Sequence, residues 1–568
     1  GAIMREGISA RSRSRSDRVR DPLPSSERLV AALLWIFPAV VVLSAWIQDD
    51  AFITLRTVDN WVHGYGLRWN PVERVQSFTH PLWMFLLSGL YFVTREAYFT
   101  TLALSLVCTV LAWRLALTRV AAHTWTAVLA GGLLLLSRAF VDYSTSGLEN
   151  PLTHLLLAAL ALHLLTGDSS PRAAARTALL AALAYLNRPD AVLFFVPALA
   201  LHLLDARRLN PRRGRSVAVV GALVLGFVPL MAWEIFSLVY YGALVPNTAY
   251  AKLGAGIPQF GLLVQGAYYF LYTLTRDPAT MVGLGLALVV VLRRGPREAR
   301  LLLAGSGLYL LYIVWIGGDY MGGRFLSAPL FAAMLALSRC EIERTPRRVL
   351  VAATATVALV LPSVFAPVIA QFRIPGVVDE RTSFAPHTGL LGALRPGGWP
   401  DHFFRRKGEL AQARGETPII DAYVGFMGYW AGPGVHIVDL IGLSDPLLAR
   451  LPGQVGGTFN RFGEKLAWKV GHVSRPLPAG YLETLRSGEN RLEDPDLARL
   501  WDDLALVTRG PLWTAERWRA ILRLHSGEAS ARAAAWAVRH PEELARVPED
   551  LRTLFTYDIR EVLDADVR

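Results

Sequence analysis

Apolar blocks separated by short polar breaks fill the chain from Leu29 to Ala370, and they constrain the fold more than any other feature. About 20 consecutive apolar residues are enough to cross a bilayer as a helix. From Gln371 onward the sequence has the mixed composition of a soluble domain. Only 18% of the residues are charged, whereas about a quarter is usual in soluble proteins. We therefore expect a polytopic α-helical membrane protein with three parts: a disordered basic tail at 1–28, a transmembrane domain at 29–371 and a soluble domain at 372–568.

Arginine clusters at the ends of the apolar blocks predict the topology. The net charge is +12, but because the arginines flank apolar blocks we interpret it as a positive-inside signal and expect no nucleic-acid partner. The tail then lies in the cytoplasm. Eleven spans fit the clusters, and they are expected at 29–47, 98–118, 122–140, 148–166, 174–189, 190–206, 215–240, 279–293, 299–316, 325–341 and 348–370. An odd number of spans leaves the soluble domain outside the cell membrane.

Two further apolar stretches, His80–Val93 and Phe260–Leu274, would break this arrangement if they crossed the membrane. Both are rich in aromatic residues, so we expect amphipathic helices in the outer interface. The breaks on the outer side hold almost all the acidic and unusual polar residues of the membrane half, whereas the inner breaks hold little but arginine. This asymmetry predicts that chemistry takes place at the outer face.

Asp49 and Asp50 follow the first apolar run directly. Adjacent residues on a helix point about 100° apart, so one carboxylate could face a cavity and the other a neighbouring loop. A partly desolvated carboxylate there could take a proton from an acceptor hydroxyl, which is the work of a general base. The plainer interpretation is a helix end that has reached water.

Other polar residues of the outer breaks are candidates for binding. Glu149 and His80 could position an acceptor or a sugar. The alternatives are an acidic residue that the helix dipole favours in a first turn, for Glu149, and a structural histidine, for His80. Lys252 is the only lysine of the membrane half and could bind a lipid phosphate, with Asn247 and Tyr250 beside it in "PNTAYAK".

The segment "GGDYMGGRF" carries Asp319 and Arg324 between four glycines. Glycines let the backbone approach a ligand, and an arginine can hold a phosphate with two hydrogen bonds. A tight loop with an internal Asp–Arg pair is the alternative. Arg188 in "NRPD" could likewise bind phosphate or pair with Asp190.

Nothing in the sequence demands a cofactor. There is no HExxH motif, no His/Cys cluster and no phosphate-binding glycine loop, and Cys108 and Cys340 are expected to be core residues. A divalent metal held by acidic outer residues stays an open alternative.

Six motifs in this order resemble one family: "DDAFITLR", "HPLW", "GLENPL", "NRPD", "PNTAYAK" and "GGDYMGGRF". Together with "GLSDPLLARLP" and "WKVGHVSRPLPAGYLE", they resemble the actinobacterial terminal β-(1→2)-arabinofuranosyltransferases of the GT-C glycosyltransferase superfamily. The resemblance runs from about Leu29 to the end of the chain.

The resemblance implies a GT-C membrane enzyme with 29–371 as its catalytic domain. It implies decaprenylphosphoryl-β-D-arabinofuranose as donor and the arabinan ends of arabinogalactan or lipoarabinomannan as acceptor. An aspartate of the first outer loop would be the base, here Asp49 or Asp50, and we prefer Asp50 as base with Asp49 as its supporting acid. Donor and product would both be β, so two displacements or a front-face route is needed. Another polyprenyl-phosphate-sugar transferase, such as a mannosyltransferase, a lipid transporter and a wall-assembly scaffold are the alternatives.

The soluble part is expected to contain a strand, a short helix and a strand within Glu416–Pro446, followed by helices from Pro495. Trp468 and His472 could stack on sugar rings or simply belong to the core. We expect this domain to hold the acceptor at the outer mouth of the protein, as a carbohydrate-binding module would.

Overall fold

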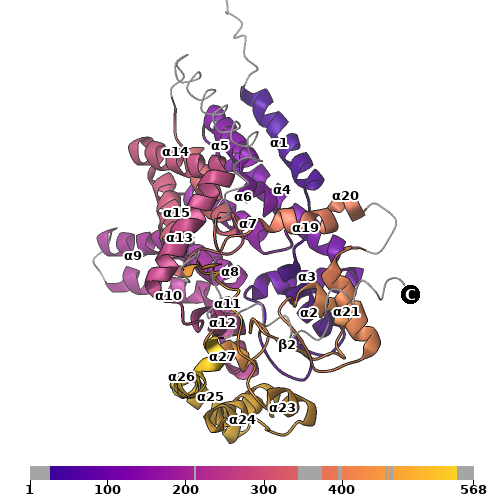
Figure 1. Ribbon diagram of the computed structural model, residues 1–568. Helices are drawn as coiled ribbons and strands as arrows, with labels where there is room; N and C mark the ends of the chain where they lie inside the picture. The colour runs from indigo at the N-terminus through magenta and orange to yellow at the C-terminus, as the bar shows by residue number, and fades with distance from the viewer. Residues whose placement is uncertain are drawn as a thin grey trace, which may run out of the picture.

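The computed structural model describes residues 26–209, 213–342, 374–393, 399–454, 458–459 and 465–545. A bundle of helices forms one end of the molecule, and a smaller part built from the last third of the chain forms the other (Figure 1). The predicted span at 348–370, most of the basic tail and the expected domain boundary at 371 lie outside the described residues.

The first half of the bundle is helical almost throughout. Its elements are α1 (Ser26–Leu43), α2 (Asp49–Val62), α3 (Pro81–Thr94), α4 (Tyr98–Leu115), the π-helix η1 (Ala116–Val120), α5 (Thr124–Leu136), α6 (Arg138–Asp142), α7 (Asn150–Leu164), α8 (Pro171–Asn187), the 3₁₀ helix η2 (Pro189–Phe194) and α9 (Val196–Leu209).

The second half continues in the same way. It comprises α10 (Arg213–Gly226), α11 (Val228–Tyr240), α12 (Asn247–Leu253), α13 (Gln259–Arg276), α14 (Pro278–Arg294), α15 (Arg297–Ile316), the 3₁₀ helix η3 (Arg324–Leu326) and α16 (Ser327–Leu337). Every predicted span within the described residues therefore coincides with helix, although the bounds shift by several residues.

The helices that are long and apolar enough to cross a membrane alone are fewer than the eleven predicted spans. Within the described residues, two do so, Tyr98–Val120 and Arg297–Ile316. Two bent pairs would raise the number to four, one of them α10 with α11 at 50°. Shorter apolar helices, among them α3, α5 and α7, are 10–17 residues long. These helices favour a membrane protein, and the count of eleven spans stays a prediction.

The stretch predicted to lie in the interface at 260–274 forms most of α13. A 106° bend separates α13 from α14, so the two helices do not form one straight span. The other such stretch forms α3, which begins at Pro81 after a non-helical His80. Their depth in a bilayer stays a prediction.

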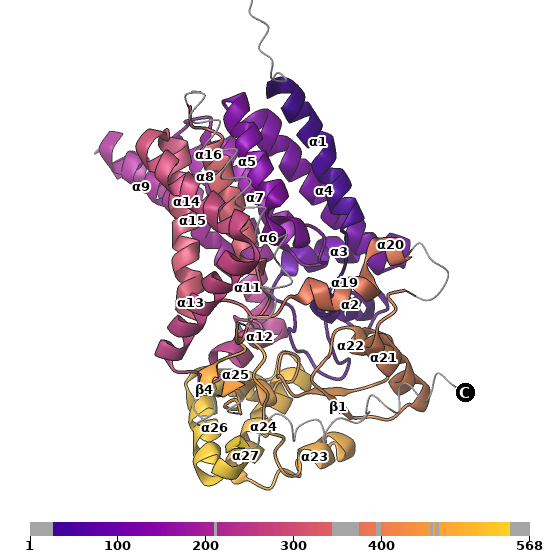
Figure 2. The same cartoon turned by 45° about the horizontal axis from the view of Figure 1, so that its top comes forward.

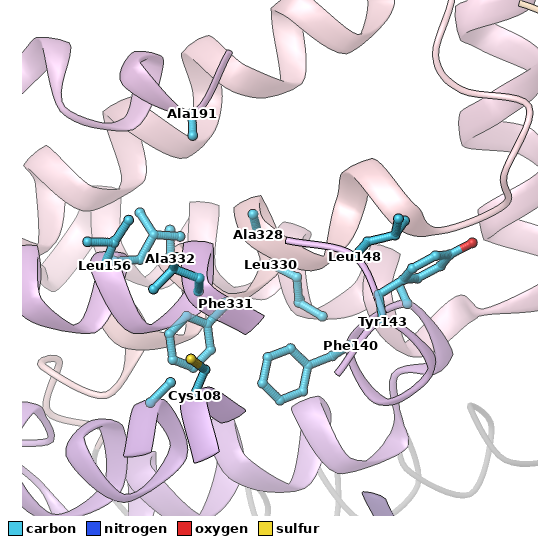
Figure 3. Packing of buried hydrophobic residues seen from close by; sticks show 14 of the residues in the cluster. Cys108, Phe140, Tyr143, Leu148, Leu156, Ala191, Ala328, Leu330, Phe331 and Ala332 are labelled. Carbon is cyan, nitrogen blue, oxygen red and sulfur yellow. The ribbon is translucent and has the colours of Figure 1, made fainter. Parts of the chain in front are cut away.

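Apolar side chains from distant helices fill the interior of the bundle (Figure 3). Phe140 of α6 and Phe331 of α16 stack at 5.4 Å between ring centroids, with planes only 7° apart. Cys108 lies in the same cluster, and it and Cys340 are buried free thiols, as expected of core residues. Such stacked pairs add to the free energy gained by burying apolar surface.

The remaining elements form the smaller end of the molecule. They are α19 (Glu380–Thr388), α20 (Leu390–Ala393), α21 (Phe403–Arg414), β1 (Ile419–Asp421), α22 (Phe426–Ala431), β2 (Ile437–Asp439), the 3₁₀ helix η4 (Leu448–Arg450), β3 (Thr458–Phe459), β4 (Lys465–Ala467), α23 (Tyr481–Ser487), α24 (Pro495–Arg509), α25 (Ala515–His525), α26 (Glu528–Arg539) and α27 (Pro541–Ala545).

The predicted strand, short helix and strand are confirmed as β1, α22 and β2. The two strands pair in parallel, with Ile419 opposite Ile437, and both are fully buried, which explains their run of branched apolar residues. The predicted helices from Pro495 are confirmed as α24 to α27.

The two ends of the molecule are joined by backbone bridges. Trp46, just after α1, bridges to Gly389, and Met321, after α15, bridges to Val378. As a result, α19 lies beside the N-terminal helices (Figure 2), close to the start of α2. The bridges thereby bring residues at the start of α2 close to residues of α19 and of the loop after α15.

Candidate active site

Asp49 and Asp50 are the first two residues of α2, so they begin a second helix after the end of α1 at Leu43. Their side chains diverge, as their helical positions predict. Asp49 contacts α22 of the smaller part, whereas Asp50 contacts the loop before η3. The two adjacent carboxylates thus have different environments.

Asp49 is buried and its carboxylate is engaged by the backbone. The N–H of Phe426 donates to Oδ1 at 2.7 Å, and the N–H of Gly425 donates to Oδ2 at 3.2 Å. Burial raises the pKa of Asp49 to about 7, and the charge of Asp50 adds to the rise. With both oxygens committed, Asp49 fixes α2 against α22.

Gly425 lies so close to Asp49 that a side chain does not fit. A Cβ atom there would stand 2.0 Å from the carbonyl oxygen of Asp49. We expect Gly425→Ala to lower the free energy of unfolding by about 1–3 kcal/mol, the usual cost of overpacking. Gly434→Ala is the matched control, because its Cβ would meet nothing within 4 Å. Equal melting temperatures for the two variants would contradict this packing.

Asp50 is half-buried and faces a group of charged and aromatic residues. The hydroxyl of Tyr320 donates to its Oδ2 at 3.3 Å. Burial raises the pKa of Asp50 above the ordinary value, while the charges of Arg324 and Lys252 oppose the rise. Asp50 is therefore a carboxylate that solvent can reach, with a raised proton affinity and cations close by.

Glycines shape the loop that carries Asp319, Tyr320 and Arg324. Gly317 and Gly318 after α15 have φ of +85° and +72°, which an L side chain adopts only with strain. Arg324 Nη1 lies 3.6 Å from Asp319 Oδ2, so the internal pair weighed from the sequence is present. The loop thereby places a buried cation next to Asp50.

Glu149 is fully buried between three basic side chains. Its Oε1 lies 2.9 Å from Arg188 Nη1 and 3.2 Å from Arg324 Nη2, and its Oε2 lies 3.3 Å from His80 Nδ1. Burial lowers the pKa of His80 to about 4, so its ring is neutral at pH 7. These contacts favour a supporting role for Glu149 and His80 over direct contact with a sugar.

Arg188 also makes the local pair that the sequence left open, with its Nε 2.6 Å from Asp190 Oδ1. Its guanidinium lies over the ring of Phe325, 4.1 Å from the centroid. Arg188 and Arg324 thus share Glu149 as a partner, and they contact the same carboxylate oxygen.

Lys252 of α12 is exposed, and the carboxylates of Asp319 and Asp50 act on its charge. Its neighbours in the motif face elsewhere. Asn247 Nδ2 donates to the carbonyls of Gly442 and Asp445, at 2.9 and 3.0 Å. Tyr250 packs under the guanidinium of Arg450 at 4.3 Å. These contacts do not favour the phosphate-binding role expected of Asn247 and Tyr250.

Two residues of the group were not predicted from the sequence, Glu380 and Lys469. Burial raises the pKa of Glu380 to about 8, with Asp50 adding to the rise and Lys469 opposing it. Lys469 Nζ lies 4.9 Å over the ring of Tyr320. Its rarity as one of four lysines was a signal that could have found it, whereas nothing around Glu380 in the sequence marked that residue.

His472 contacts the site through Tyr320, with ring centroids 3.9 Å apart. Trp468 lies against α13, where a Cβ on Gly261 would stand 2.9 Å from its Nε1. Sugar stacking by either ring stays untested.

The described part of the chain contains no group of three His, Cys, Asp or Glu side chains placed to hold a metal ion. The carboxylates around Asp50 are accompanied by arginine and lysine, which compete with a cation for them. These residues therefore do not fit the divalent metal that the sequence left open.

Two curated proteins named terminal beta-(1->2)-arabinofuranosyltransferase are similar to this chain. The protein from Mycobacterium tuberculosis is 32% identical over 355 residues, covering 54% of this chain and 55% of that protein. The protein from Corynebacterium glutamicum is 27% identical over 564 residues, covering 80% and 79%. The predicted resemblance is confirmed, although the chain matches only about half the length of the first relative. No protein-family model matches the chain.

Two solved structures resemble the fold distantly. Arabinosyltransferase EmbB from Mycobacterium smegmatis has 16% identity and a TM-score of 0.39, covering 57% of this chain and 32% of that chain. ArnT from Cupriavidus metallidurans, bound to undecaprenyl phosphate, has 12% identity and a TM-score of 0.41, covering 93% and 90%. At these TM-scores the likenesses carry no argument about the site.

Proposed function

We propose that this protein is a membrane glycosyltransferase of the GT-C type that moves arabinofuranose from a polyprenyl phosphate to the end of an arabinan. The observation that supports it most is the half-buried Asp50 beside Tyr320, Lys252 and Arg324. The names of both curated relatives support the sugar and the β-(1→2) linkage. The donor would be decaprenylphosphoryl-β-D-arabinofuranose.

In this proposal Asp50 takes the proton of the acceptor hydroxyl. Its raised pKa suits that work, because a base is most effective when its pKa lies near the working pH. The departing phosphate gains negative charge as its bond to the sugar breaks. Lys252 and Arg324 are the cations near Asp50 that can stabilise that charge.

The other predicted residues would act through these. Glu149, with Arg188 and His80 around it, holds Arg324 in place. Asp49 holds α2 against α22, so it fixes the start of the helix that carries Asp50. These are positioning roles.

Retention of the β configuration needs either two displacements or a front-face attack. In the first route a carboxylate attacks the anomeric carbon, the phosphate leaves with the bonding electrons, and the acceptor oxygen then displaces the carboxylate while losing its proton. Asp319 and Glu380 are further carboxylates whose charges act within the group, so either route has the groups it needs.

Tyr320→Phe tests the pH dependence of this base. The Tyr320 hydrogen bond favours the ionised form of Asp50, so losing it should raise the pKa of Asp50 further. Since the base works deprotonated, the ascending limb of kcat/KM against pH should move to higher pH, and activity at pH 7 should fall several-fold. A limb that stays in place, or moves to lower pH, would show that the group being titrated is not Asp50.

A panel of donors tests the sugar. Purified protein in lipid nanodiscs would receive decaprenyl phosphate carrying arabinofuranose or mannose, with a short arabinan as acceptor. We expect transfer from the arabinofuranosyl donor alone. Transfer from the mannosyl donor alone would favour the alternative of another sugar, and uptake of either lipid without transfer would favour a transporter.

The site's place at the outer face of a bacterial plasma membrane belongs to the same proposal. The apolar helices support membrane insertion, and the arginine clusters favour a cytoplasmic N-terminus with the C-terminal domain outside. Surrounding lipids and the ends of arabinogalactan or lipoarabinomannan would then be the partners.

A further inference from the structure

Three polar atoms beside Asp50 are buried without a hydrogen-bond partner in the described part of the chain. They are Gln48 Oε1, Arg324 Nε and Asp319 Oδ2, the last of which has only the 3.6 Å ion pair with Arg324. Leaving a buried polar atom unpaired costs about 1–3 kcal/mol. Two of these atoms accept and one donates, so a ligand that carries both hydroxyl groups and acceptor oxygens, as a sugar phosphate does, would complete them.

Gln48 is 1% exposed, and its side chain does not cap the helix that follows it. It is the N-cap of α2, a position where Ser, Thr, Asp or Asn would bond the first turn, yet its side chain makes no capping bond. It turns instead toward the loop before η3.

Two donors from different elements converge on one atom. Gln48 Nε2 lies 3.4 Å from Met321 Sδ, and Arg324 Nη1 lies 3.6 Å from the same sulfur. A thioether is a weak acceptor, whereas an amide and a guanidinium are strong donors. An oxygen at that point would satisfy both donors far better than the sulfur does.

The Met321 side chain is buried in the apolar interior, but the contacts that hold the loop at this residue are made by its backbone. The Met321 backbone is held by the bridge to Val378 and by the Tyr269 hydroxyl, which donates to its carbonyl at 3.1 Å. The side chain itself has three rotatable bonds and adapts readily. The sulfur therefore occupies a place that the backbone does not require it to fill.

We propose that an oxygen of the sugar-phosphate donor takes the place of Met321 Sδ and is held there by Gln48 Nε2 and Arg324 Nη1. This subsite rests on the proposed function. A positive guanidinium and a neutral amide together select an acceptor oxygen, either of the phosphate or of the sugar ring. Gln48 then becomes a donor-binding residue directly before the two aspartates.

Binding of two lipids tests the subsite. Full-length protein in nanodiscs would be titrated with decaprenyl phosphate and with decaprenylphosphoryl-arabinofuranose. We expect Gln48→Met, which keeps the length of the side chain, to raise Kd about tenfold, as loss of a bond to a charged group would. Gln48→Glu should weaken binding further, because it also adds a repelling charge. Gln412→Met makes the same exchange at an exposed position of α21, so it is the matched control and should change Kd less than twofold.

The Kd values of the two lipids show which oxygen the subsite binds. Weaker binding of both lipids by folded Gln48 variants assigns the subsite to a phosphate oxygen, and weaker binding of the arabinosyl lipid alone assigns it to a sugar oxygen. Unchanged Kd values in Gln48→Met and Gln48→Glu, at wild-type melting temperature, would overturn the subsite while leaving the proposed function intact. If the wild type binds neither lipid, the proposed function itself fails, and the subsite fails with it.

Discussion

Asp50→Asn should lower the rate of arabinofuranose transfer by about a thousandfold, within the range usual for loss of a general base. The asparagine keeps the size of the side chain and can still accept from the Tyr320 hydroxyl, so the fold should hold. The asparagine cannot take the proton of the acceptor hydroxyl. The measurement is kcat for transfer from the lipid donor to a short arabinan, with the melting temperature recorded beside it.

Asp49→Asn is the control that separates the two neighbours. Its amide can accept one backbone N–H but not two, so α22 should be held less firmly, at a cost of about 1–3 kcal/mol in the free energy of unfolding. The Asp49 variant should therefore lose stability and keep measurable transfer. If Asp49→Asn is inactive and Asp50→Asn active, the assignment of the base is reversed.

Glu149→Gln should be the most destabilising single change in the site. Glu149 is fully buried and contacts Arg188 and Arg324, so removing its charge leaves two buried guanidinium groups short of a partner. Breaking a buried pair in this way costs about 3–5 kcal/mol. The measurement is the free energy or temperature of unfolding in a fixed detergent or nanodisc.

Glu489→Gln provides the matched control. Glu489 pairs with Arg491, but both side chains are more than half exposed, and such surface pairs contribute about 0–1 kcal/mol. A Glu149→Gln protein as stable as Glu489→Gln would show that the network around Glu149 does not support the site.

The helices were predictable because their signal is local. Apolar runs and arginine clusters placed the helices of the bundle, and the alternation of turn residues with buried apolar runs placed β1, α22 and β2. The bounds were less accurate. No local signal marked Asp49 as the first residue of α2, because its amphipathic stretch follows a break of only five residues after Leu43.

The site was predictable in part. Asp50, Arg324 and Lys252 were predicted because they are conspicuous polar residues in the outer breaks, and the structure brings them together. The direction in which each side chain points depends on tertiary contacts. For that reason Asn247, which looked like a phosphate ligand, proves to bond the loop that follows β2. Glu380 is far away in the sequence, and it reaches the site where the bridges of Val378 to Met321 and of Gly389 to Trp46 hold α19.

Transfer by the purified protein decides whether Asp50 is the base of an arabinofuranosyltransferase. Purified protein would be incubated with radiolabelled decaprenylphosphoryl-β-D-arabinofuranose and a synthetic arabinan, and the linkage of the product would be determined by NMR and by digestion. We predict one added residue in a β-(1→2) bond, formed by the wild type and by Asp49→Asn but not by Asp50→Asn. A wild-type protein that is folded and binds the donor, yet adds no arabinofuranose, or adds it equally well without the Asp50 carboxylate, would contradict the account.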